Sequence, residues 1–242
     1  MRTRFCFLLA AMGLLAGCVK ETPAPETPIE TTEPSETTDS VFYVTVGIEQ
    51  DAESKTSLGD KDENDVRKVQ WSNTDQIRVS DKVSASVAVD GEDSSKATFT
   101  FNNPQPSSPF NVLYPASIFK DSTHVTLPAV QTYKTNNIDD NMFPMAGQGT
   151  DLTSLQVHNL CAILKISVKR AASTPDEDAI VAIRFRGNNN EQVCGDFTID
   201  YENATLTGAS DAASDKEIKM TFDAQATSTE EALSYYINAN LS

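Results

Sequence analysis

The chain has 242 residues, of which 39 % are hydrophobic, and its 35 acidic and 19 basic side chains give a formal net charge of −16. This composition is too apolar for a disordered chain and too polar for a multi-span membrane protein, and the length suits one large or two modest domains. The negative charge argues against a nucleic-acid partner, because phosphates require surfaces rich in Lys and Arg.

The N-terminus has the pattern of a lipoprotein signal peptide. Two arginines precede an apolar run over residues 5–15, which is shorter than the ~20 residues that a membrane-spanning helix needs. The tetrapeptide at residues 15–18, Leu-Ala-Gly-Cys, resembles a bacterial lipobox, whose cysteine is acylated and becomes the first residue after cleavage. We therefore expect removal of residues 1–17 and lipidation of Cys18. The alternative is a general secretory peptide in which Cys18 has no such role.

Residues 18–40 are predicted to form a lipidated, disordered stalk. After the cysteine, the segment holds four prolines, six threonines and five glutamates. Such a composition cannot bury enough apolar surface to offset the entropy of ordering, and proline and glutamate repulsion keep it extended. Val19-Lys20-Glu21 is similar to the surface-export signal of Bacteroidota lipoproteins. We expect a cell-surface location in the outer membrane, with a periplasm-facing lipoprotein as the alternative.

From residue 41 onward, hydrophobic residues recur with a period of two, which predicts β-strands. Ala97, Phe99 and Phe101 would share one face of a strand, and the valines of residues 83–89 would share one face of another. Clusters of Gly, Pro, Asn and Asp separate these runs, and no stretch has a convincing helical stripe. The predicted strands cover residues 41–48, 77–79, 83–89, 97–101, 160–168, 180–186, 192–199, 218–222 and 233–241.

This pattern predicts an all-β protein with two antiparallel β-sandwich domains in tandem, of transthyretin-like or Greek-key type. The composition shifts at residues 169–178, so we place the domains at residues 41–170 and 171–242. The second region is small for an independent sandwich. Its last run has the pattern of a strand with no partner after it, and we therefore expect the second domain to be incomplete at its C-terminus.

Cys161 and Cys194 are the cysteines that remain beyond the anchor. We expect two reduced, half-buried cysteines, and a single disulfide between them, which an exported protein permits, is the alternative. Trp71 is expected to be a core residue at a strand end, beside a turn formed by Asp75.

Catalytic, cofactor and metal motifs are not recognisable in the sequence. Residues 60–65 imitate the start of a calcium loop but lack its glycine and its final glutamate, so we expect a solvated acidic hairpin. His124 and His158 have no ligand at metal spacing. We therefore predict a non-enzymatic protein with no cofactor, no metal site and no catalytic residues.

Several short motifs stand in a fixed order along the chain. They are Lys-Thr-Ser-Leu-Gly at 55–59, Val-Gln-Trp-Ser-Asn-Thr-Asp-Gln-Ile-Arg-Val at 69–79, Tyr-Pro-Ala at 114–116, Leu-Pro-Ala-Val-Gln-Thr-Tyr at 127–133, Phe-Pro-Met-Ala at 143–146, and His-Asn-Leu-Cys-Ala-Ile-Leu-Lys-Ile at 158–166. Behind a lipobox and a stalk, this order resembles the fimbrillin-like lipoproteins of Bacteroidota, the major and minor fimbrial subunits.

The resemblance implies a pilin that is exported as a lipoprotein and assembled by β-strand addition. In that family a trypsin-like protease removes the anchor and the first strand, and a strand of a neighbouring subunit takes its place. Here residues 41–48 would be the removed strand. Lys55 would be the candidate processing site, because no arginine stands between that strand and Arg67. An uncleaved, lipid-retaining subunit is the alternative.

The resemblance also implies partners and a role. The partners are other fimbrial subunits, the outer-membrane lipid through Cys18, and a host or bacterial surface ligand. The role is to build cell-surface fimbriae that contribute to adhesion, with an extracellular fimbrium as the location after processing. The alternative function is that of a monomeric surface lipoprotein that binds a glycan or a host protein.

Overall fold

The computed structural model describes residues 40–49, 58–61, 67–134, 138, 142–171, 179–226 and 233–240. Within these ranges the protein is all-β, as predicted, with nineteen strands and two 3-10 turns, Ala116–Ile118 and Ala213–Lys216. None of the helical turns in this part of the chain is long and apolar enough to cross a bilayer. The predicted signal peptide, Cys18 and Lys55 lie outside the described residues.

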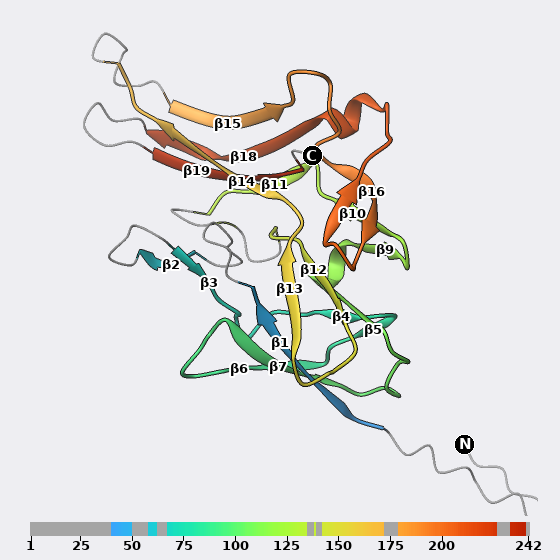
Figure 1. Ribbon diagram of the computed structural model, residues 1–242. Helices are drawn as coiled ribbons and strands as arrows, with labels where there is room; N and C mark the ends of the chain where they lie inside the picture. Colours follow the sequence, from blue (N-terminus) through green and yellow to red (C-terminus); the bar gives the residue numbers. More distant parts are fainter. Residues whose placement is uncertain are drawn as a thin grey trace, which may run out of the picture. The chain divides into compact units, whose positions relative to one another are not determined.

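The largest sheet has eight strands in the order β5-β4-β8-β12-β13-β1-β7-β6 (Figure 1). Their bounds are β1 Phe42–Ile48, β4 Arg78–Val79, β5 Lys82–Val83, β6 Ser86–Val89, β7 Lys96–Phe101, β8 Phe110–Tyr114, β12 Met145–Gly149 and β13 Leu155–Asn159. The first strand in the described part of the chain, β1, is therefore an interior strand of this sheet, flanked by β13 and β7, which are distant from it in sequence.

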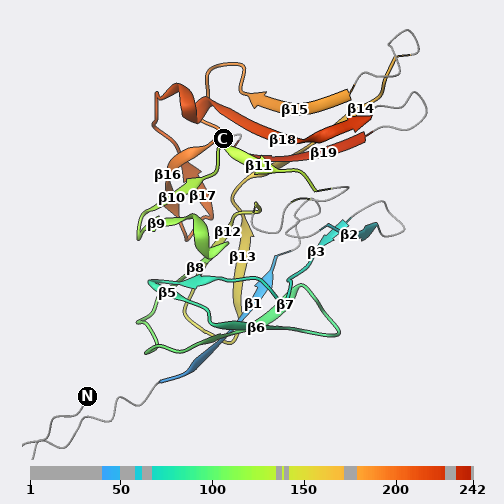
Figure 2. The same ribbon diagram turned by 180° about the vertical axis from the view of Figure 1, so that it is seen from behind.

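The other strands form four smaller sheets, which Figure 2 shows from the opposite side. One has the order β17-β16-β10-β9, with β9 Phe119–Asp121, β10 His124–Leu127, β16 Gly195–Asp200 and β17 Thr205–Thr207. Another has the order β11-β18-β15, with β11 Val130–Thr132, β15 Ala179–Arg186 and β18 Glu217–Ala226. Two pairs complete the set: β14 Ala162–Val168 with β19 Leu233–Ala239, and β2 Leu58–Lys61 with β3 Arg67–Val69.

Most strand pairs are antiparallel, but β1 is parallel to β13 and β11 is parallel to β18. Three of the sheets join strands from the two sides of residue 170, because β10 pairs with β16, β11 with β18 and β14 with β19. The predicted boundary at residue 170 therefore does not divide one group of sheets from another. Pairings of this kind link segments far apart in sequence, and local patterns do not reveal them.

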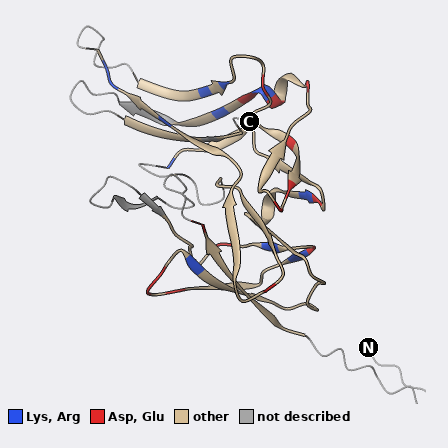
Figure 3. Ribbon diagram, viewed as in Figure 1, with Lys and Arg blue, Asp and Glu red and all other residues tan. Residues whose placement is uncertain are grey.

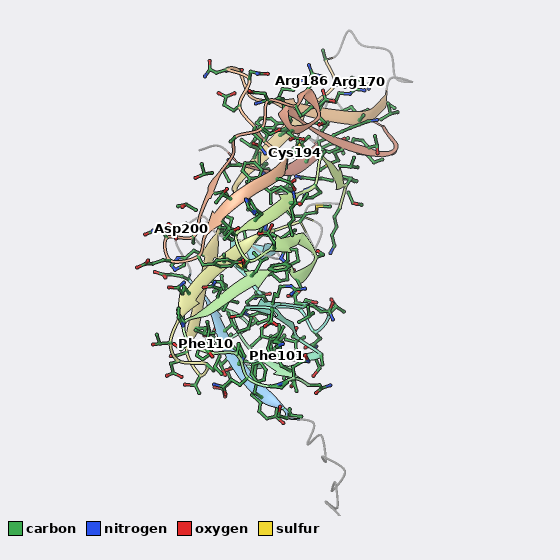
Figure 4. All side chains as sticks on the ribbon, turned by 90° about the vertical axis from the view of Figure 1, so that its right-hand side faces the viewer. Phe101, Phe110, Arg170, Arg186, Cys194 and Asp200 are labelled. Carbon is green, nitrogen blue, oxygen red and sulfur yellow. The ribbon has the colours of Figure 1, made fainter. Side chains whose placement is uncertain are left out.

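The described hydrophobic core consists of three clusters. The first contains Trp71, Phe99 and Phe101 and lies against the eight-stranded sheet. The second gathers around Phe197 and Leu206, and the third around Met220 and Tyr235. In Figure 4 the labelled Phe101 belongs to the first cluster and Cys194 to the third.

The period-two pattern was correct in β7 and wrong between β5 and β6. Ala97, Phe99 and Phe101 are all buried, as predicted for one face of a strand. Val83 is 38 % exposed, however, and it is Ser84 that is buried. The Ser84 hydroxyl oxygen accepts a 3.1 Å hydrogen bond from the Ile77 backbone N–H, so a polar group takes the inward position and its hydrogen-bonding capacity is used.

Candidate strand-exchange site

The strand that the resemblance marks for removal, β1, is bonded on both sides. It pairs with β7 over six residues, from Phe42 opposite Phe101 to Gly47 opposite Lys96. On the other side Val46, Gly47 and Ile48 run parallel to Leu155–Val157. We call the place of β1 between β13 and β7 the β1 slot. The backbone pairing with β7 and β13 holds a strand in this slot and does not depend on the side chains that the strand carries.

Alternate side chains of β1 enter the first hydrophobic cluster. Phe42, Val44, Val46 and Ile48 are at most 7 % exposed, whereas Tyr43 is 63 % exposed. The Phe42 ring stacks on Phe101 with centroids 4.7 Å apart. Burying a side chain of this kind stabilises a fold by roughly 1.5–3 kcal/mol. The slot therefore selects a strand with large apolar residues at alternate positions.

Trp71 lies on the core side of the slot and contacts the backbone of β1. Its indole N–H donates a 3.2 Å hydrogen bond to the Val46 carbonyl oxygen, and its ring packs edge-on against Phe99 and Tyr114 at 5.2 and 5.3 Å between centroids. The prediction of a core tryptophan is confirmed, since only 4 % of Trp71 is exposed. Because the indole contacts backbone, it would bind any strand that occupied the slot in the same register.

The turn after Trp71 is fixed by the buried carboxylate of Asp75. The Ser72 backbone N–H donates to one carboxylate oxygen at 2.7 Å, and the Tyr114 hydroxyl donates to the other at 2.9 Å. The Asp75 backbone N–H donates to the Ser72 carbonyl oxygen at 3.0 Å and closes the turn. The predicted turn at Asp75 is thus confirmed, and its role in the structure is to support the Trp71 side of the slot.

Gly47 adds a size requirement to the slot. A Cβ at this position would lie 2.6 Å from the side-chain oxygen of Gln156, which covers the glycine from β13. A replacement strand would need a small residue here or would have to displace the Gln156 side chain, which is exposed and free to move outward. The slot therefore has a sequence rule beyond apolar alternation. The sequence alone carried no signal for this rule, since the register of β1 against β13 joins residues more than a hundred positions apart.

The two cysteines are free thiols. Cys161 packs against the second hydrophobic cluster and Cys194 lies within the third, so the structure has no bridge between them and the disulfide alternative is corrected. Burial raises the pKa of Cys161 to about 12. Burial, with the nearby charge of Asp215, raises the pKa of Cys194 to about 11. The Cys194 thiol donates to the backbone oxygens of Ser214 and Glu217, at 3.4 and 3.2 Å.

Each of the two histidines has a ring nitrogen close to a carboxylate oxygen. His124 Nδ1 lies 2.8 Å from Asp121 Oδ1 and 3.0 Å from Thr123 Oγ1. In a catalytic triad, one ring nitrogen of the histidine contacts the hydroxyl and the other contacts the carboxylate. Here the same nitrogen, Nδ1, lies close to both, so the arrangement does not match a triad. His158 Nε2 lies 3.1 Å from Glu49 Oε2. Within the described ranges, no three His, Cys, Asp or Glu residues are grouped to hold a metal ion.

Comparison of the chain with protein-family models, with curated proteins and with solved structures finds no match. The likeness to fimbrillin-like lipoproteins therefore depends on the ordered motifs of the sequence, and the function below is a proposal.

Proposed function

We propose that this protein is a non-enzymatic, fimbrillin-like subunit of cell-surface fimbriae, which takes up a strand of a neighbouring subunit in the β1 slot. The observation that carries the proposal is the place of β1. It is the first strand of the described residues, it lies inside the largest described sheet, and four of its seven side chains belong to the core.

Loss of β1 would leave two kinds of unsatisfied surface. The facing edges of β7 and β13 would expose unpaired backbone groups, and Phe101, Phe99 and Val157 would lose their cover. Another strand that adds to the sheet pairs these backbone groups, and its alternate side chains cover the exposed core residues. The incoming strand would run antiparallel to β7 and parallel to β13, as β1 does.

In this proposal Cys18 carries the lipid that holds the subunit at the outer membrane during export, and cleavage after Lys55 frees both the lipid and β1. Lys55 follows Ile48 by seven residues, so a cut there would leave β1 intact as one peptide. A copy that escapes the cut would keep its lipid and serve as an anchored subunit. Adhesion would follow from contact of the fimbria with a host or bacterial surface ligand.

A strand-uptake experiment tests the proposal. A chain that begins at Leu58 is mixed with a labelled peptide of residues 40–49, and the peptide that co-elutes on gel filtration is measured. We expect uptake close to one peptide per chain. A matched peptide with Val44→Ser and Val46→Ser should not be retained, because it removes two buried side chains. Equal retention of both peptides, or folding of the shortened chain with no uptake of either, would contradict the proposal.

A further inference from the structure

Two neighbouring cavities lie at the end of β15, away from the β1 slot. One has a volume of about 250 Å³ and is lined by Phe185, Arg186 and Asn188, among others. The second has a volume of about 300 Å³ and is lined by Gln192, Ser210 and Lys216 among others. Glu191 and Asn240 line both. Each volume is near the lower end of the roughly 300–1,000 Å³ of small-molecule sites, so each suits one ring-sized unit of a ligand.

The carboxylate of Glu191, which lines both cavities, is held in place. Asn189 donates to it from its backbone N–H at 2.9 Å and from its side-chain amide at 3.0 Å. A Cβ on Gly187 would lie 2.0 Å from Glu191 Oε2, so the loop can approach the carboxylate because residue 187 is a glycine. Hydrogen bonds from the backbone at Glu191 and Asn189 also hold the pKa of Glu191 below its ordinary value. At neutral pH it is a fixed hydrogen-bond acceptor for both cavities.

The second cavity has an equally fixed wall. Gln192, only 8 % exposed, donates from its side-chain amide to the backbone oxygens of Asp196 and Cys194 at 2.7 and 3.1 Å. Its amide oxygen accepts from the Ser210 backbone N–H at 2.8 Å. These three bonds tie the segment after β17 to β16. The cavity is therefore bounded by backbone that is already ordered, which lowers the entropy that a ligand must overcome on binding.

Arg186 and Glu191, which line the cavities, each have a charge of opposite sign nearby, and Asp211 of the second cavity is exposed to solvent. Arg186 Nε donates to Glu217 Oε2 at 2.6 Å, and the positive charge of Lys216 acts on the Glu191 carboxylate. Figure 3 shows basic and acidic residues close together on β15 and at the start of β18, and Figure 4 marks Arg186 there. A ligand with a net charge would have to break such a pairing. Neutral hydroxyl groups can instead bond to the exposed Asn188 amide and to the Glu191 carboxylate, whereas the Gln192 amide and the Ser210 hydroxyl already have partners within the wall.

We infer that the paired cavities bind a neutral saccharide, with one ring in each cavity and Glu191 reached from both. Carboxylate and amide side chains accept from and donate to sugar hydroxyls, and Phe185 offers an apolar surface in the first cavity. The inference does not depend on strand exchange, because neither cavity is lined by β1, β7 or β13.

Saturation-transfer NMR of the full chain in detergent tests the inference, with maltose, cellobiose and lactose as probes. We expect at least one of these disaccharides to bind. Asn188→Ala in the first cavity and Asp211→Ala in the second should each weaken that binding by roughly three- to tenfold, the effect of one lost hydrogen bond. Both side chains are exposed, so neither change should disturb folding.

Asn73→Ala is the matched control, because Asn73 is an exposed asparagine in the turn after Trp71 and lines neither cavity. It should bind the disaccharide like the unaltered chain. The inference is overturned if none of the three probes binds the folded protein, or if the control weakens binding as much as the two cavity variants. Tighter, salt-sensitive binding of a uronic-acid disaccharide would overturn the choice of a neutral ligand. None of these outcomes bears on the β1 slot.

Discussion

The hydroxyl of Tyr114, at the end of β8, donates a 2.9 Å hydrogen bond to the buried carboxylate of Asp75. The same tyrosine ring packs edge-on against Trp71, whose indole binds the backbone of β1. The turn at residues 72–75 and the strand β8 are thus joined at the point where the core receives β1. A substitution that breaks the Tyr114–Asp75 hydrogen bond should therefore also disturb Trp71 and its contact with β1.

Removing the Tyr114 hydroxyl should destabilise the fold. Tyr114 and Asp75 are 1 % and 4 % exposed, so Tyr114→Phe withdraws a donor from a buried carboxylate. Hydrogen bonds to charged groups contribute about 1.5–3 kcal/mol, and we expect a loss of this size in the free energy of unfolding measured with urea. Tyr43→Phe is the control, because Tyr43 is 63 % exposed on β1. Equal stabilities of the two variants would show that the contact contributes nothing.

A methyl group at Gly147 should be poorly tolerated in the centre of the sheet. Its Cβ would lie 2.0 Å from the backbone oxygen of Gln156, so β12 and β13 would have to move apart. Gly147→Ala should cost about 1–3 kcal/mol or more, as overpacking does in a close-packed interior. At Gly91 an added Cβ meets nothing within 4 Å, and Gly91→Ala should change the stability by less than about 1 kcal/mol. A neutral Gly147→Ala variant would contradict the β12–β13 packing described above.

The cysteines should be unreactive while the protein is folded. With the pKa of Cys194 raised to about 11 and that of Cys161 to about 12, few molecules carry a thiolate at neutral pH. Labelling by iodoacetamide, followed by peptide mapping, should be slow at both positions in native protein and fast in urea. Rapid labelling of the native protein, or a peptide that links Cys161 to Cys194, would show that the two cysteines are not free thiols of low reactivity.

Acid should weaken the turn at Asp121. Hydrogen bonds from the Thr123 backbone N–H and then from His124 lower the pKa of Asp121 to about 2, from an ordinary value of 3.8. Because the folded pKa is the lower one, the stabilisation is complete above the unfolded value and is lost as the pH falls from about 4 through 2. The stability difference between the unaltered chain and Asp121→Asn should therefore narrow over that interval. A difference that stays constant from pH 5 to 2 would rule this out.

Local patterns predicted strands better than they predicted sheets. The alternation of Ala97, Phe99 and Phe101 identified β7 and its buried face because a half-buried strand places every second side chain inward. The same rule failed at Ser84, since a hydroxyl with a backbone donor within reach can take a buried position. Ser84 takes the inward position in place of Val83, while Val87 and Val89 still pack against the first cluster, and sequence does not reveal which hydroxyl will find a partner.

The candidate site was foreseen in part. The motifs marked residues 41–48 as the strand to be exchanged, but the parallel register of Val46 with Leu155 and the cover of Gly47 by Gln156 come from pairings remote in sequence. The Gly-Asn-Asn-Asn run at residues 187–190 is one of the Gly- and Asn-rich clusters that separate the predicted strands. Its place around two cavities depends on Asn240 and on the segment 208–211, which no local pattern connects to it.

The N-terminal peptide of the mature protein, isolated from cells and sequenced, tests the central claim most directly. We expect a chain that starts immediately after Lys55 and runs as heat-resistant ladders on gels, because strands inserted between subunits resist dissociation. A lipidated chain that starts at Cys18 and is found in filaments would mark an anchored subunit that keeps β1. A monomer that starts at Cys18 and never occurs in filaments would contradict the fimbrial function.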